Sequence, residues 1–184
     1  MTQGARELLL LTNGPGELLT WVRPLLQAVR AHDASVAIKI VVLPCQFGSG
    51  RETTIASTFG ADLVVSPHEF ARSMAQGRAP KGVGAKRGIV VQLGGSVHLA
   101  ARLARRLRYP LHRYSFTEAG HRRLERLYLP DEATARRARR RGTPPHRVEV
   151  VGNLVADALD GAAPVRDPGT PHVLLFPGSR DAFA

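Results

Sequence analysis

The hydrophobic residues of this chain fall into short runs separated by amphipathic stretches. Residues 7–12 predict a buried strand, residues 18–31 an amphipathic helix and residues 36–43 a second strand. Further strands are predicted at 62–66, 88–93, 111–116, 124–129 and 147–151, and further helices at 51–59, 68–76, 97–108 and 131–141. Strands that are nearly continuous in apolar residues and flanked by helices are typical of a parallel sheet covered on both faces. The pattern therefore predicts an α/β fold with a doubly wound, mainly parallel, Rossmann-like sheet.

Two segments are poor in hydrophobic residues. Residues 77–87 are rich in glycine, proline and basic residues and have little to bury, so they predict a mobile surface loop. Residues 161–171 contain three prolines among small and charged residues, which is typical of a linker. We therefore predict an N-terminal Rossmann-like domain over residues 1–160, and residues 172–184 as the truncated start of a second domain.

Composition narrows the class of protein. A chain of 184 residues, 43% of them hydrophobic, suits one soluble domain and a short extra segment. No apolar run is long enough to span a bilayer, and the first residues lack the features of a secretory signal, so we expect a cytoplasmic protein. Cys45 is the only cysteine, which excludes an internal disulfide and a cysteine-based zinc site.

The chain is strongly basic, with a formal net charge of +11, and all but three of its 26 basic residues are arginines. The arginines cluster at Arg102, Arg105, Arg106 and Arg108, at Arg122, Arg123 and Arg126, and at Arg136, Arg137, Arg139, Arg140 and Arg141. Such a face can bind nucleic acid, a phosphorylated substrate or anionic lipid at the inner face of the cell membrane, or it can simply be solvated. Aromatic residues make up only 5% and do not interleave with the basic stretches, which argues against nucleic acid.

Ligands of open parallel sheets bind beyond the carboxyl ends of the strands, so the loops there contain the candidate site residues. Asn13, Gly14, Gly16 and Glu17 follow the first predicted strand, where glycine permits close backbone approach and a helix start favours an anion or a hydroxyl-rich ligand. Glu17 is either a charge at the helix N-terminus or a carboxylate facing the cleft. The glycine spacing fits neither a dinucleotide fingerprint nor a P-loop.

A second glycine turn follows the strand predicted at 88–93. Gly95 and Ser96 would bring backbone N–H groups and a hydroxyl to the cleft, and His98 lies one turn into the next helix. Alternatively, Ser96 is a plain N-cap and His98 packs at the surface. No Gly-x-Ser-x-Gly motif surrounds Ser96, which argues against a hydrolase nucleophile.

A third candidate lies near the end of the chain, where residues 172–180 read His-Val-Leu-Leu-Phe-Pro-Gly-Ser-Arg. This pattern predicts a buried strand that runs into a phosphate-binding turn formed by Gly178, Ser179 and Arg180. Backbone N–H groups, a hydroxyl and a guanidinium are suited to binding an anion. An ordinary turn with an exposed arginine is the alternative.

Three motifs together resemble the N-terminal half of lipid-A-disaccharide synthase and its relatives, which are GT-B glycosyltransferases. They are Gly-Pro-Gly-Glu after the first strand, Val-Val-Gly-Asn-Leu-Val-Ala-Asp-Ala-Leu at 150–159 and Leu-Leu-Phe-Pro-Gly-Ser-Arg at 174–180. The resemblance implies two Rossmann-like domains around a cleft. The first would hold a lipid-linked or glycolipid acceptor, with Gly14 and Gly16 in its wall. The second, C-terminal domain would hold a nucleoside diphosphate sugar donor, with Gly178, Ser179 and Arg180 at its pyrophosphate. The resemblance implies no metal ion or other cofactor, and no turnover by this segment alone.

The chain departs from the family at the proposed catalytic base. The family has Ala-Pro-Asp-Phe-Asn where this chain has residues 93–98, and Ser96 stands at the position of the aspartate. A hydroxyl is not a base of comparable strength, so there are three alternatives: Glu17 or His98 is the base, the reaction differs, or this branch of the family no longer catalyses lipid A assembly. The alternative class of function is a non-catalytic module on the same fold that binds a sugar nucleotide, another anion or a membrane surface.

Overall fold

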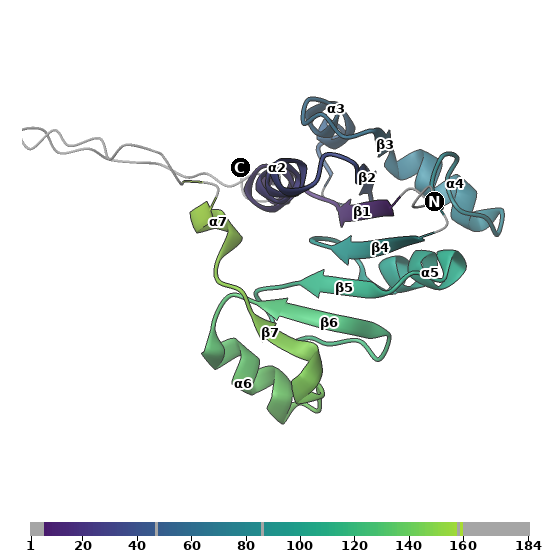
Figure 1. The fold of residues 1–184 in the computed structure, drawn as a ribbon. Helices are drawn as coiled ribbons and strands as arrows, with labels where there is room; N and C mark the ends of the chain where they lie inside the picture. The colour runs from purple at the N-terminus through teal and green to yellow at the C-terminus, as the bar shows by residue number, and fades with distance from the viewer. Residues whose placement is uncertain (1–5, 47, 86, 158, 160–184) are drawn as a thin grey trace, which may run out of the picture.

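The computed structural model describes residues 6–46, 48–85, 87–157 and 159. Seven strands form a sheet in the order β3–β2–β1–β4–β5–β6–β7, and every neighbouring pair is parallel. The strands are β1 (Arg6–Thr12), β2 (Ala37–Val42), β3 (Leu63–Val65), β4 (Arg87–Gln92), β5 (Leu111–Tyr114), β6 (Leu124–Leu129) and β7 (Val148–Val150). Figure 1 shows them stacked in this order, with α7 (Leu154–Asp157) beyond their arrowheads. The predicted doubly wound, Rossmann-like fold is confirmed.

Helices cover both faces of this sheet. One face carries α2 (Arg23–His32) and α3 (Glu52–Ser57), and the other carries α4 (Pro67–Ala75), α5 (Val97–Leu107) and α6 (Glu132–Arg140). Strand β1 serves both cores, since Leu10 packs with the first group of helices and Leu9 with the second. Burial on both faces explains why the strands read as nearly continuous apolar runs. Within the part of the chain that the structure describes, no helix has the length and apolar character needed to cross a membrane.

The helix that follows β1 contains a widened turn. The segments α1 (Pro15–Glu17), the π-helical η1 (Leu18–Val22) and α2 run on without a break. Pro24 has no N–H and its ring would clash with the carbonyl four residues before it in a regular α-helix. The Arg23 N–H instead bonds to the Leu18 carbonyl, five residues back. The helix begins three residues earlier than predicted, so Glu17 lies in its first turn.

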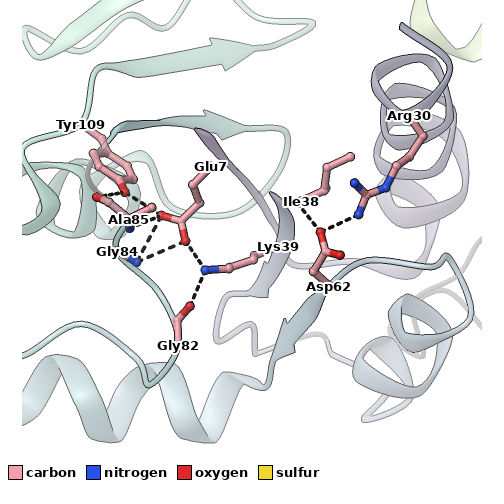
Figure 2. A network of polar contacts seen from close by, with 9 residues as sticks. All are labelled: Glu7, Arg30, Ile38, Lys39, Asp62, Gly82, Gly84, Ala85 and Tyr109. Carbon is pink, nitrogen blue, oxygen red and sulfur yellow. Dashed lines mark hydrogen bonds and ion pairs between the residues drawn. The ribbon is translucent and has the colours of Figure 1, made fainter. Parts of the chain in front are cut away.

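The buried carboxylate of Glu7 joins β1 to β2 and to the loop before β4 at the amino-terminal edge of the sheet. Glu7 in β1 is only 1% exposed and pairs with Lys39 of β2 (Figure 2). It accepts hydrogen bonds of 3.1 Å from the backbone N–H groups of Gly84 and Ala85 and one of 2.7 Å from the Tyr109 hydroxyl. Burial alone would raise the pKa of Glu7, but the hydrogen bonds outweigh burial and lower the pKa below its ordinary value of 4.5. Burial and the hydrogen bond to Glu7 raise the pKa of Tyr109.

This network corrects the prediction of a mobile surface loop with little to bury at 77–87. The loop is anchored at Gly84 and Ala85, and Lys39 also donates to the Gly82 carbonyl. The anchor was missed because a lone acid at the start of an apolar strand gives no sign of its partners in the sequence.

Candidate functional site

The strand order changes direction between β1 and β4. From β1 the chain continues through α2 to β2 and β3 on one side, and then returns to β4 on the other side, from which it continues through α5. Because α2 and α5 cover opposite faces, the loops that leave β1 and β4 diverge at this point, which is where open parallel sheets bind ligands. The predicted loops 13–17 and 94–96 therefore lie side by side at the carboxyl edge.

The Glu17 carboxylate lies between these two glycine-containing loops. A Cβ placed on Gly94 would lie 2.7 Å from Glu17 Cδ and 2.8 Å from Oε2, and one placed on Gly14 would lie 2.7 Å from Oε2. The Asn13 side chain reaches the same place, with Oδ1 at 3.0 Å from the Gly94 Cβ position. A Cβ at either glycine would displace the carboxylate, so the absence of a Cβ allows it to lie this close to the backbone. Of the two interpretations of Glu17, this position corresponds to a carboxylate turned toward the switch point.

The turn after β4 is held from within by Gln92. This side chain is 1% exposed, and its Nε2 donates to the carbonyls of Gly94 at 3.1 Å and Gly95 at 2.7 Å. Gly95 adopts a φ of 77°, which favours glycine. The role of Gln92 was not predicted, because a single amide at the end of an apolar run does not reveal that it bonds to the following turn.

Several buried oxygens at this edge lack hydrogen bonds. Within the described part of the chain, Thr12 Oγ1, Asn13 Oδ1 and Gln92 Oε1 have no hydrogen-bond partner. Buried polar atoms are normally paired, so these three mark a place where a donor from water or a ligand belongs. Of the three residues, Asn13 lines a pocket of about 260 Å³, together with Leu43 and Glu52 among others.

Ser96 occupies the N-cap position of α5, but its side chain accepts no hydrogen bond from the helix. By contrast, Ser66 and Asp131 cap α4 and α6 with hydrogen bonds of 3.2 Å and 2.7 Å. Ser96 is therefore the N-cap of α5 by position, as the alternative interpretation had it, but its hydroxyl makes no capping hydrogen bond. Its exposed hydroxyl lies at the positive end of the α5 dipole, at the carboxyl edge of the sheet.

His98 is exposed and packs edge-on against His121, with 5.3 Å between the ring centroids. His121 belongs to the connection between β5 and β6. Burial, followed by His98 and the neighbouring arginines, lowers the pKa of His121. This arrangement matches the surface packing considered for His98. The pair could not be predicted, since nothing in the sequence relates the two histidines.

An aromatic cluster at the end of β5 also escaped prediction. Trp21, Tyr114 and Phe116 lie with ring centroids 5.4 to 5.7 Å apart, and Phe116 is 42% exposed. The Tyr114 hydroxyl donates to the Gly152 carbonyl at 3.2 Å and accepts from the Leu154 N–H at 3.2 Å. The cluster thereby joins the helix after Glu17 to the turn after β7.

Other candidates are placed differently. Gly16 lies in α1, where an added Cβ would meet nothing within 4 Å. Gly178, Ser179 and Arg180 lie outside the described residues, as do the predicted linker and the second domain. In the described ranges, no group of three or more His, Cys, Asp or Glu residues is arranged to hold a metal ion.

Two comparisons with known proteins gave no relatives: no model of a protein family matches the sequence, and no curated protein matches it.

Proposed function

We propose that the chain is the acceptor-side domain of a GT-B glycosyltransferase of the lipid-A-disaccharide synthase type. The reaction would transfer a sugar from a nucleoside diphosphate sugar to a hydroxyl of a lipid-linked or glycolipid acceptor. The observation that carries this proposal is the Glu17 carboxylate between Gly14 and Gly94 at the switch point of the sheet. The fold alone hosts many functions, so the reaction class comes from the motif resemblance described above.

In this proposal, the acceptor hydroxyl lies beside the Glu17 carboxylate. Its oxygen attacks the anomeric carbon of the donor while its proton moves to Glu17. The bond from that carbon to the diphosphate oxygen breaks, and its electron pair leaves with the nucleoside diphosphate. Arg180 would stabilise this leaving group. His98 is the second candidate base, but its packing against His121 makes Glu17 the better one.

Two further features support an acceptor that combines hydroxyls with an apolar part. The Ser96 hydroxyl and the unpaired oxygens at the switch point can form hydrogen bonds with a sugar. The partly exposed aromatic cluster of Trp21, Tyr114 and Phe116 offers an apolar surface at the same edge. Exposed apolar surface beside such hydrogen-bonding groups is typical of a ligand site.

Fluorescence tests acceptor binding directly, because Trp21 is the only tryptophan of the chain. We expect a saturable change in emission on titration with a detergent-dispersed glycolipid, and none with detergent alone. Absence of saturation by the glycolipid would contradict the proposal. Tight binding of a nucleoside diphosphate sugar without any acceptor would instead favour the non-catalytic sugar-nucleotide module.

The catalytic role is tested by turnover in a chain that includes the donor-binding domain. If Glu17 is the base, Glu17→Gln should lower kcat by about 10²- to 10⁴-fold and leave acceptor affinity nearly unchanged. His98→Ala is the matched comparison and should retain turnover. Loss of turnover in His98→Ala with normal turnover in Glu17→Gln would identify His98 as the base. Full activity of both variants would show that this domain supplies no base.

A further inference from the structure

A pocket of about 410 Å³ lies between two segments that the glycosyl-transfer proposal does not use. One wall is the connection between β5 and β6, and the other is the turn that follows α6. The walls approach closely at Gly120, where an added Cβ would lie 2.8 Å from Thr143 Oγ1. Three arginines line the pocket, namely Arg122, Arg141 and Arg147, and we call it the arginine pocket.

The charges of the arginine pocket are not balanced. Among the described residues that line the pocket, the one carboxylate is Glu118, which Arg141 engages at 3.1 Å and Arg137 at 3.8 Å. Arg122 and Arg147 form no ion pair with any carboxylate in the described part of the chain. Two guanidinium groups in one concave site therefore lack an anion.

Part of the pocket is already arranged for binding. Arg147 Nη1 donates to the Arg122 carbonyl at 3.3 Å, which holds its guanidinium against the opposite wall. The Arg123 N–H donates to His121 Nδ1 at 3.2 Å, so a neutral His121 ring carries its proton on Nε2 and remains a donor. Fixing donors before a ligand arrives reduces the entropic cost of binding.

We propose that the arginine pocket binds a phosphate group through Arg122, Arg147 and the His121 ring. Guanidinium groups pair with phosphate oxygens through two parallel hydrogen bonds, which explains why a pocket with surplus arginines selects this anion. The phosphate belongs either to a small soluble ester or to a lipid headgroup. The lining of this pocket includes neither Glu17 nor the glycine loops of the switch point, and the proposal does not depend on the proposed transfer reaction.

The lowered pKa of His121 provides an internal reporter. The neighbouring arginines contribute to this low pKa, and a bound phosphate would offset their charge and raise the pKa. The experiment follows the His121 ring signals by NMR across a pH series, with and without inorganic phosphate, at constant ionic strength set with chloride. We expect saturable shifts of the His121 ring and an upward shift of its pKa.

Variants that each remove one positive charge, inside or outside the pocket, test whether phosphate binds in the arginine pocket. Arg122→Gln and Arg147→Gln should each weaken phosphate binding by about threefold to tenfold. Arg51→Gln removes the same charge from an exposed position at the start of α3 and should leave binding unchanged. Arg122 is exposed, so its variant should fold even if the Arg147 variant does not.

Three probes distinguish a soluble phosphate ester from a lipid headgroup, namely inorganic phosphate, glycerol 3-phosphate and vesicles containing phosphatidic acid. Tighter binding of glycerol 3-phosphate than of inorganic phosphate, lost in Arg122→Gln, would support a soluble ester. Vesicle binding that Arg122→Gln weakens more than Arg51→Gln does would support a headgroup. Equal effects of the two variants on all three probes, or no saturable shift of His121, would overturn the proposal.

Discussion

The Glu17 carboxylate lies against the backbone of Gly94, so closely that a Cβ at Gly94 would stand 2.8 Å from Glu17 Oε2. The two residues belong to loops that leave adjacent strands and continue to helices on opposite faces. Their contact places a carboxylate at the switch point of the sheet. Glu17, in the first turn of the helix after β1, therefore contacts both the loop that leaves β1 and the loop that leaves β4.

The first prediction concerns this contact. In Gly94→Ala the added Cβ displaces the far end of the Glu17 side chain, so we expect a loss of unfolding free energy at the low end of the overpacking range, about 1 kcal/mol. Urea denaturation measures the loss. Gly16→Ala is the matched control, because a Cβ there meets nothing within 4 Å. Alanine within a helix should make that variant equally stable or more stable by up to about 1 kcal/mol. Wild-type stability of Gly94→Ala would show that Glu17 is not held in this position.

The second prediction concerns the pH dependence of stability. The hydrogen bonds to Glu7 lower its folded-state pKa below 4.5, so its contribution is complete above about pH 4.5 and is lost as pH falls through the folded-state pKa. Glu7→Gln leaves Lys39 without its buried partner and should cost about 3 kcal/mol at neutral pH.

Urea denaturation of both proteins from pH 7 to pH 3 provides the measurement. The difference between wild type and Glu7→Gln should stay constant down to about pH 4.5 and shrink at lower pH, because the folded-state pKa of Glu7 lies below 4.5. A difference that does not change across this range would contradict the ionised network.

The alternation of apolar runs with amphipathic stretches was sufficient to predict the sheet, because strands buried on both faces and separated by helices are typical of a covered parallel sheet. It also indicated which loops meet, since parallel strands share one carboxyl edge. It could not show that Gln92 holds the Gly94 turn or that Glu7 anchors the loop at Gly84, because these hydrogen bonds join positions through the fold. That the Ser96 hydroxyl makes no hydrogen bond to α5 could not be predicted either, since an N-cap preference states only a tendency of the residue type.

The third prediction concerns the basic helices. Helices α5 and α6 cover the same face of the sheet, and Arg102, Arg105 and Arg106 are exposed along α5. We propose that this face attracts anionic membranes. Vesicle binding, measured by flotation, should then require acidic lipid and should weaken steeply between low and physiological salt.

A triple change of Arg102, Arg105 and Arg106 to Gln should reduce vesicle binding strongly while leaving the phosphate titration of the arginine pocket unaltered. Equal binding to neutral vesicles, or binding to neither kind, would make these arginines an ordinary solvated surface.

The most direct test of the proposed acceptor site is residue-resolved NMR of the isotope-labelled chain during titration with a detergent-dispersed glycolipid. We expect saturable shifts of the backbone amide signals of Gly14, Gly94, Gly95 and Ser96. Gly60, on the loop before β3, serves as an unaffected reference. Signals of the switch-point glycines that stay unchanged at saturating glycolipid, or shifts confined to the arginine pocket, would contradict the proposed acceptor site.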